Sequence, residues 1–242
     1  MHRKLFNLAQ ANTGKGAGLR AEVADDTATI YVYDVIDPYW GVSAADMAKT
    51  LAGITASNIV MRINSPGGDV FEGRAMMAQL VAHPATITAK IDGLAASAAS
   101  VLALAASSVE IAEGGFYMIH KGWTWMMGNA DDFRDASSLL DKVDGAIVES
   151  YTGKSGKSAD EVLAWMKAET WFTAQEAVDA GFCDAILPTT AAGKTNARAF
   201  NLSVYDHAPP ALVETPEQPP AIDEGARVRS LARLGLYERT AA

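Results

Sequence analysis

The chain has 242 residues, of which 49% are hydrophobic and 20% charged. This composition excludes a disordered or fibrous protein, because it can bury one sizeable core. The length suits one large domain or one domain with appendages. The net charge of -9 argues against binding to nucleic-acid phosphate or anionic lipid. The single cysteine, Cys183, excludes an internal disulfide framework and a cysteine-built zinc site.

The distribution of apolar and charged residues also bears on where the protein is located. The longest uncharged stretch, residues 93–109, is rich in Ala, Ser and Gly and shorter than the roughly 20 apolar residues of a bilayer span, so we interpret it as a buried helix. The N-terminal sequence carries early positive charge but lacks the continuous apolar core of a secretion signal. We therefore expect a cytoplasmic protein that neither crosses nor binds a membrane.

Prolines and charges divide the chain unevenly. Residues 189–242 hold five of the nine prolines and equal numbers of acidic and basic side chains, so the acidic excess lies entirely in the first 188 residues. The prolines predict an extended linker over residues 206–220. Apolar spacing then predicts a short docking helix over residues 224–239, with a frayed, exposed helix as the alternative.

Three parts follow from this division. They are an N-terminal arm (residues 1–24), a main domain (residues 25–188), and a proline-rich linker with a docking helix (residues 189–242). The composition of the arm does not say whether it is a propeptide, a gate or a docking segment.

Strand-like and helix-like patterns alternate through the main domain. The expected strands are residues 27–34, 58–63, 85–91 and 116–119. The expected helices are residues 43–54, 70–83, 97–107, 130–151, 159–167 and 173–180. This alternation predicts an α/β fold in which helices pack on a sheet.

Several common site motifs are absent from the sequence. There is no phosphate-binding G-x-x-x-x-G-K-[ST] loop and no H-E-x-x-H zinc motif. The glycine-containing run at residues 16–21 precedes the first expected strand, whereas a dinucleotide-binding run follows one. No G-x-S-x-G nucleophile elbow occurs either. The sequence therefore predicts no cofactor and no metal.

The segment Ile-Asn-Ser-Pro-Gly-Gly, residues 63–68, ends an expected strand just before a helix. Two glycines after a proline allow a tight turn whose bare N–H groups suit a developing oxyanion. Taken alone, the same segment is more often a plain turn.

A second segment places a serine where a strand passes into a helix. Ser97 follows Gly93-Leu-Ala-Ala, and alanines on both sides leave room for a substrate carbonyl. The positive end of the helix dipole favours a nucleophile there, although a helix N-cap is an equal interpretation. Ser100 competes for the role, but one turn into the helix its hydroxyl is expected to bond a backbone carbonyl.

A general base and an orienting acid can also be selected. Of the four histidines, only His120 follows a strand and can lie beside Ser97. The other three lie in the chain ends or at the end of a helix: His2, His83 and His207. Glu169, between two helices and flanked by Trp165 and Trp171, is the preferred acid, with a solvated surface glutamate as the alternative.

These elements together resemble the Clp protease proteolytic subunit family of serine peptidases. The resemblance rests on four motifs in order, spans roughly residues 28–188 and leaves both chain ends uncovered. The motifs are INSPGG at residues 63–68, G-x-A-A-S ending at Ser97, MIH at residues 118–120, and the block at residues 172–184.

The resemblance implies a role for each candidate residue. Ser97 takes the position of the nucleophile and His120 that of the base, while the backbone N–H groups of Gly68 and Ala98 form the oxyanion hole. The acid falls on Glu169, where the family usually has aspartate, with the fallbacks Asp160 and Glu161.

The implied fold is α/β, a crotonase-like spiral of strand-strand-helix units with a helix-strand handle. The implied partners are further copies of the chain in a ring, either a heptamer or stacked rings, and an ATP-dependent unfoldase. Trp123, Trp125, Met126 and Met127 replace a more polar stretch of the handle.

The sequence at residues 33–41, 68–73 and 168–174 resembles that of the Clp-type peptidases of tailed phages and prophages. That likeness implies capsid maturation, capsid or scaffold proteins as substrates, and location in the host cytoplasm or the procapsid. The tail from residue 189 is then expected to tether such a partner.

Three alternatives stay open. The same fold supports acyl-CoA chemistry that needs neither Ser97 nor His120. A serine–lysine dyad can use Lys121 or another lysine. A catalytically idle ring or capsid-assembly scaffold component is the alternative outside the enzymes, and active-site labelling of Ser97 distinguishes it.

Overall fold

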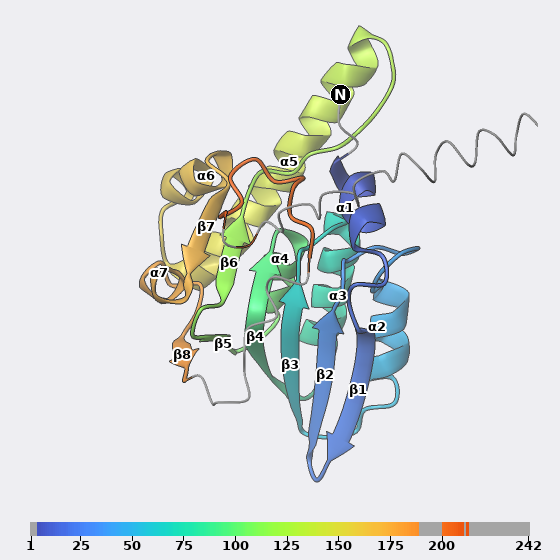
Figure 1. Cartoon of the computed structure of the whole chain (residues 1–242), viewed down its shortest axis with the longest axis vertical. Helices are drawn as coiled ribbons and strands as arrows, with labels where there is room; N and C mark the ends of the chain where they lie inside the picture. Colours follow the sequence, from blue (N-terminus) through green and yellow to red (C-terminus); the bar gives the residue numbers. More distant parts are fainter. Residues whose placement is uncertain (1–3, 189–199, 211, 213–242) are drawn as a thin grey trace, which may run out of the picture.

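The computed structural model describes residues 4–188, 200–210 and 212. One sheet runs through the body in the order β1-β2-β3-β4-β5-β8, and β6 and β7 extend it from β4. The helices α2, α3 and α4 lie behind this sheet in the view of Figure 1. The strands are β1 (Gly18–Ala24), β2 (Thr27–Tyr33), β3 (Asn58–Ser65), β4 (Thr86–Ala96), β5 (Ser108–Ala112), β6 (Phe116–Ile119), β7 (Thr170–Thr173) and β8 (Ala185–Leu187). The helices are α1 (Lys4–Asn12), α2 (Ala44–Leu51), α3 (Val70–Ala82), α4 (Ala98–Ala103), α5 (Ala130–Ser155), α6 (Ala159–Lys167) and α7 (Ala174–Asp179).

The long strand β4 has two neighbours on one side. Its middle part, Thr88 to Ile91, pairs in parallel with β5, and its end, Leu94 to Ala96, pairs in parallel with β6. The sheet therefore divides along β4, and the residue that follows β4 lies beside the end of β6. This division brings Ser97 and His120 together, because each directly follows one of these two strands.

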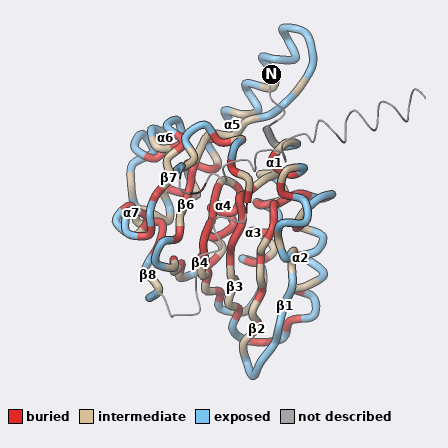
Figure 2. The backbone as a smooth tube through the Cα atoms, in the orientation of Figure 1, coloured by how far each residue is buried: buried red, intermediate tan, exposed pale blue. Residues whose placement is uncertain are grey.

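Two apolar clusters pack around the sheet. The larger cluster joins alternate residues of the strands, such as Ile30 and Met61, to helix residues such as Leu80 and Leu102. Period-2 alternation in β2 gives this pattern directly, since its buried residues are every second one. Figure 2 shows the buried stretches gathered in the central strands and in α4.

The smaller cluster lies around the ends of β4 and β6. It contains Leu94 and Met118 from these strands, Leu8 from α1, and Phe200 and Leu202 from the C-terminal segment. Both ends of the described chain therefore contribute to one apolar cluster.

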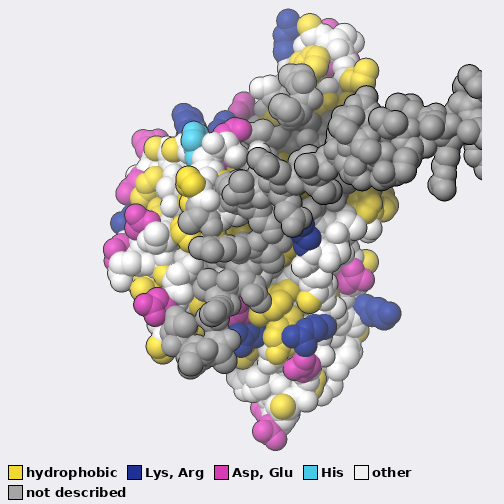
Figure 3. Space-filling view, viewed as in Figure 1, with side chains coloured by type: hydrophobic (Ala, Val, Ile, Leu, Met, Phe, Trp, Pro, Cys, Tyr) yellow, Lys and Arg dark blue, Asp and Glu magenta, His cyan; other side chains and the backbone are white. Residues whose placement is uncertain are grey.

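The central strands of the sheet carry paired charges. Arg62 on β3 forms an ion pair with Asp92 on β4, and Lys90 pairs with Glu110 on β5 at 3.3 Å. Figure 3 shows basic and acidic side chains close together on this face of the molecule. Such alternation neutralises the surface locally and creates no single-sign patch on the visible part of this face.

The α/β fold is confirmed, and the structure refines several element predictions. The predicted helix over residues 97–107 is shorter, and residues 93–96 belong to β4. The interpretation of residues 93–109 as one buried helix was therefore wrong, because a parallel strand buried on both faces is as apolar as a buried helix. Among the described residues, no helix is long and apolar enough to span a membrane.

The chain ends were only partly anticipated. Helix α1 lies within the predicted N-terminal arm, and its Leu8 and Ala9 are completely buried. Residues 206–210 contain no helix or strand. The docking helix predicted over residues 224–239 lies outside the described residues, and the division into three parts stays a prediction.

Helix α5 projects from the body, and residues 121–129 run beside its first turns (Figure 1). This pair of segments corresponds to the predicted handle. Residues 121–129 form no strand in the single chain, because a strand is defined by a hydrogen-bonded neighbour. Asn129 caps α5 by accepting hydrogen bonds from the N–H groups of Asp131 and Asp132.

Candidate active site

Ser97 occupies a sharp turn between β4 and α4. Its backbone has φ 54° and ψ -123°, which is unusual for a residue other than glycine. The N–H group of Ser97 donates to the carbonyl oxygen of Met118 on β6 at 2.9 Å, which ties the turn to the neighbouring strand. Strained backbone of this kind costs of order 1–3 kcal/mol and persists at functional sites where the surroundings fix it.

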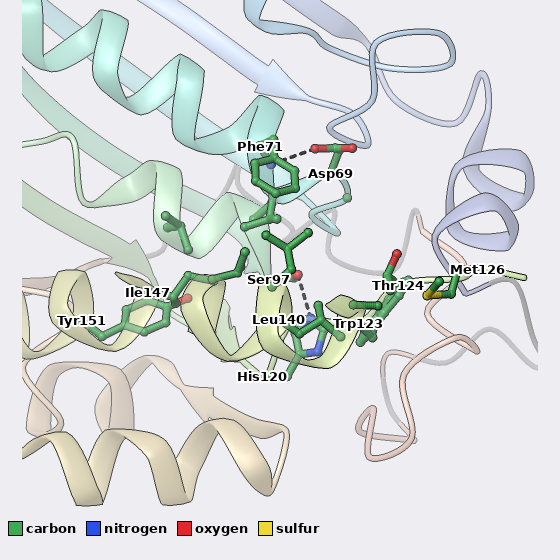
Figure 4. Close-up of a pocket in the computed structure, with 18 residues that line it drawn as sticks. Asp69, Phe71, Ser97, His120, Trp123, Thr124, Met126, Leu140, Ile147 and Tyr151 are labelled. Carbon is green, nitrogen blue, oxygen red and sulfur yellow. Dashed lines mark hydrogen bonds between the residues drawn. The ribbon is translucent and has the colours of Figure 1, made fainter. Parts of the chain in front are cut away.

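His120 lies within hydrogen-bonding distance of this serine. The Nε2 atom of His120 is 2.7 Å from Ser97 Oγ, and Figure 4 shows the two side chains facing each other. The imidazole packs between the rings of Trp123 and Tyr205, with centroid distances of 5.9 and 5.6 Å. A hydroxyl paired with an imidazole at this distance can lose its proton to the ring as it attacks a carbonyl.

The glycine turn lies against the same serine. Gly67 and Gly68 have positive φ angles of 83° and 147°. A side chain on Gly67 would collide with the Ala96 carbonyl oxygen, and one on Gly68 with that of Ile36. Only glycine therefore fits at either position.

Two residues beside Ser97 have backbone N–H groups that could bind a substrate oxygen. The N–H groups of Gly68 and Ala98 donate to no acceptor among the described residues, and both residues line the cavity next to Ser97. Such unpaired donors suit an oxygen on which negative charge develops.

Ser100 is not available as the nucleophile. Its hydroxyl is 2.6 Å from the carbonyl oxygen of Ser97 and 2.7 Å from the hydroxyl of Tyr151. The prediction that it bonds a backbone carbonyl is thus confirmed. Tyr117 in turn donates to the Ser100 carbonyl oxygen at 2.7 Å, so buried hydrogen bonds fix the first turn of α4.

Glu169 is buried at the junction of α6 and β7, and only 9% of its surface is exposed. Its φ of 49° is again unusual for a residue other than glycine. Its Oε1 atom accepts hydrogen bonds from the backbone N–H of His207 at 2.7 Å and from the indole of Trp171 at 3.4 Å. The Glu169 carboxylate is therefore buried and held in place by two hydrogen bonds. Its role as the acid that orients His120 stays a prediction.

The fallback acids lie in a different environment. Asp160 and Glu161 are exposed in the first turn of α6, where acidic side chains favour the helix N-terminus. Their position is explained by the helix alone.

A cavity of about 320 Å³ opens beside Ser97 on the side of α5. Its walls are apolar and come mainly from α4 and α5 (Figure 4), with Val101, Leu140, Val143 and Ile147 among them. Trp123, Thr124 and Met126, from the segment before α5, also line the cavity. This cavity can take an apolar side chain of a substrate whose carbonyl carbon lies at Ser97.

Two other groups lack the environment of a nucleophile or base. Lys121 forms an ion pair with the buried Asp144 on α5 at 3.0 Å, which occupies the lysine of the serine–lysine alternative. Burial raises the pKa of the Cys183 thiol to about 12, although Lys154 opposes this rise. In the described part of the chain, no group of His, Cys, Asp or Glu side chains could hold a metal ion.

Two side chains of the site were missed in the sequence. Trp171 was noted only as a flanking residue, and Tyr205, which packs on His120, was not considered. Alternate apolar residues at Phe200, Leu202 and Val204 indicate a packed segment just before the prolines. The proline count of the tail obscured this pattern.

Comparisons with known proteins identify the family of the chain. The profile of the Clp protease family matches residues 27–190, so the chain belongs to this family. The ATP-dependent Clp protease proteolytic subunit 1 of Chlamydia abortus is 34% identical over 159 residues, which are 62% of this chain and 83% of that protein. Its counterpart in Leifsonia xyli is 31% identical over 145 residues, covering 59% of this chain and 74% of that protein.

A solved structure supports the fold. A single-residue mutant of ClpP1 from Listeria monocytogenes superposes with a TM-score of 0.59 at 22% identity, covering 69% of this chain and 94% of that chain. At this identity the likeness concerns the fold alone. Helix α1 and residues 200–212 lie outside the family match.

Proposed function

We propose that this protein is a serine endopeptidase that cleaves peptide bonds through an acyl-enzyme on Ser97. The observation that carries the proposal is the 2.7 Å contact between Ser97 Oγ and His120 Nε2 at the mouth of an apolar cavity. The family and the names of the relatives support peptidase activity.

The proposed reaction begins at the Ser97–His120 pair. His120 Nε2 takes the proton of Ser97 as Oγ attacks the substrate carbonyl carbon. The N–H groups of Gly68 and Ala98 stabilise the negative oxygen of the tetrahedral intermediate. The peptide C–N bond breaks and His120 donates its proton to the departing amine. Water, deprotonated by His120, then attacks the ester and releases Ser97.

Glu169 is proposed as the acid that stabilises the imidazolium of His120. Its support is burial beside the site and a fixed carboxylate. A buried carboxylate near the base lowers the free energy of the charged imidazole, and that charge exists only while the base holds the serine proton.

The cavity predicts the substrate preference. Apolar walls favour a substrate whose residue on the acyl side of the cleaved bond is a large apolar one, since each buried CH₂ contributes about 0.8 kcal/mol. A charged residue there would lose its hydration without gaining a partner.

Assembly into a ring with further copies of the chain is proposed as well. Helix α5 and the segment before it expose Trp125, Met127, Phe133 and Leu139, with exposed fractions between 46% and 82%. Such a concentration of exposed apolar side chains indicates a contact surface. The names of the relatives include ATP dependence, so an ATP-dependent unfoldase is the proposed partner of the ring.

The finer proposal is maturation of a phage or prophage capsid, in the host cytoplasm or the procapsid. It rests on the resemblance of the sequence at residues 33–41, 68–73 and 168–174 to Clp-type peptidases of tailed phages and prophages. Co-expression of the protein with a candidate capsid protein tests this role. We expect a shortened capsid protein with the wild type and a full-length one with Ser97→Ala; an identical capsid mass in both would refute it.

The peptidase itself is tested with a fluorophosphonate, which reacts with activated serines. We expect one added phosphonyl group, mapped to the peptide that contains Ser97. A folded protein that stays unlabelled would favour the idle scaffold component instead.

A further inference from the structure

The segment described over residues 200–210 and 212 packs directly on the proposed active site, although it lies outside the family match. Phe200, Leu202 and Tyr205 are almost completely buried against Ala96 and Met118. Ala96 precedes Ser97, and Met118 lies two residues before His120. The segment, orange-red in Figure 1, thus supports the two strand ends that carry the reacting groups.

Tyr205 is the residue of this segment nearest to the chemistry. Its hydroxyl donates to the carbonyl oxygen of Pro66 at 2.5 Å, and only 5% of its surface is exposed. Pro66 begins the glycine turn that carries the Gly68 N–H group. Tyr205 therefore fixes the first peptide group of this turn (residues 66–68, the oxyanion turn).

The ring of Tyr205 also fixes the base. It lies edge-on to His120, with a centroid distance of 5.6 Å and an interplanar angle of 78°. Its other neighbour is Trp171, at 5.6 Å and 77°. Wedged between these rings, Tyr205 limits the rotation of the imidazole on the side away from the cavity.

The segment is held at both ends. The side chain of Asn12, at the end of α1, bonds the N–H and the carbonyl oxygen of Asn201 at 2.6 and 3.0 Å. Past Tyr205, the N–H of His207 donates to Glu169 Oε1 at 2.7 Å. These bonds keep Tyr205 in place and also fix the Glu169 carboxylate.

The phenol stays a hydrogen-bond donor at neutral pH. Burial raises the pKa of Tyr205, a hydrogen bond with Ser97 lowers it, and the charge of Glu169 raises it, with a net rise above the ordinary value. The hydroxyl therefore remains protonated, next to Ser97.

The segment does not occupy the substrate cavity. None of the residues that line the cavity belongs to the described part of this segment, residues 200–210 and 212. The cavity opens on the α5 side of Ser97, whereas Tyr205 contacts Pro66 and His120. This arrangement favours support of the active site over blockage of it.

We propose that Tyr205 is a positioning residue of the peptidase, which holds the His120 ring and the oxyanion turn in the geometry for acylation of Ser97. The inference rests on the proposed function. It adds a part of the active site that comes from the C-terminal segment of this chain.

The test compares Tyr205→Phe, Tyr205→Ala and the wild type in the full chain with a fluorophosphonate. The limiting rate constant of labelling and the concentration for half-maximal rate are measured separately. Leu212→Ala is the matched control, because Leu212 is buried in the same cluster, while the hydroxyl at Pro66 and the ring beside His120 belong to Tyr205. Thermal melting confirms that each variant is folded at the assay temperature.

We expect the limiting rate constant to fall about tenfold in Tyr205→Phe, which keeps the ring but loses the hydroxyl, and about a hundredfold in Tyr205→Ala. The half-maximal concentration should stay unchanged, and Leu212→Ala should label like the wild type. A partial rescue by phenylalanine is not expected of a residue that only stabilises the fold.

Three results would overturn the inference. Equal rate constants in the folded variants would show that Tyr205 does not position the site, and faster labelling of Tyr205→Ala would show that it blocks it. In both cases a labelled wild type leaves the peptidase proposal intact. An unlabelled wild type would refute that proposal, and the role of Tyr205 with it.

Discussion

The two sides of the Ser97–His120 pair differ in their packing and in their relation to the family. On the α5 side, an apolar cavity of about 320 Å³ is left open. On the opposite side, Tyr205, Trp171 and Glu169 fill the space and are hydrogen-bonded. The first side lies within residues 27–190 matched by the family, and the second depends partly on residues beyond them.

This difference separates two tasks. The part of the chain that the family matches brings Ser97 and His120 together and leaves a cavity beside them. The C-terminal segment packs on the other side of the Ser97–His120 pair. Unlike the strands and helices that carry the pair, this segment lies outside the residues that the family matches. Variants on the two sides should therefore have different kinetic effects.

The largest effect is expected for the reacting pair itself. Ser97→Ala should lower peptide hydrolysis by at least about a thousandfold, because the nucleophile is lost and binding alone remains. Ser100→Ala is the matched control and should keep labelling, since its hydroxyl bonds the Ser97 carbonyl oxygen and Tyr151. It should lower stability by about 1–3 kcal/mol, because the buried Tyr151 hydroxyl loses a partner. Hydrolysis by folded Ser97→Ala would remove this serine from the mechanism.

A smaller loss of labelling rate is expected from changes on the filled side, the side of the Ser97–His120 pair that Tyr205, Trp171 and Glu169 occupy. Glu169→Gln keeps the shape of the side chain but removes its charge, so the imidazolium is less stable and the rate constant of labelling should fall about a hundredfold. Asp160→Asn and Glu161→Gln, which are exposed in α6, should label like the wild type. If one of these two lost activity while Glu169→Gln kept it, the acid would have to be reassigned.

The open side should respond in substrate choice instead. Val143→Phe narrows the cavity, so kcat/KM should fall about tenfold for substrates with a large apolar residue on the acyl side and little for those with alanine. The exposed Lys142→Ala on the same helix is the control and should change neither. Equal losses for both substrates would contradict the assignment of the cavity.

The smallest effect concerns stability away from both sides. Burial raises the pKa of Asp184, but hydrogen bonds from Lys154 and from the Val109 N–H group lower it more, so the net pKa lies below its ordinary value of 3.8. The stabilisation is therefore present above that value and is lost as the pH falls below it. We expect Asp184→Asn to flatten the loss of stability below about pH 4, measured as urea midpoints from pH 7 downward. Parallel curves for variant and wild type would contradict this.

The sequence predicts the open side better than the filled side. Ser97, His120 and the glycine turn are each close to the end of a strand, and parallel strand ends meet at one edge of the sheet. Their proximity therefore follows from local patterns once the order of the strands is known. The shortness of α4 and the length of β4 do not, because the apolar residues 93–104 fit a buried strand and a buried helix equally well.

The filled side depends on contacts between distant parts of the chain. Tyr205 is 139 residues from Pro66 in sequence, and Asn12 is 189 residues from Asn201. No local period predicts which strand end such a segment will cover. The prolines that follow Tyr205 even predicted an extended linker instead of a packed segment.

The central claim is that Ser97 is acylated with His120 as its base. Intact-mass spectrometry of acid-quenched reactions with a peptide ester, whose acyl residue is large and apolar, tests it most directly. The account predicts an added acyl mass on the Ser97 peptide of the wild type, none in Ser97→Ala, and formation slowed by about a hundredfold or more in His120→Ala. Acylation of another residue, or equal formation in all three proteins, would contradict it.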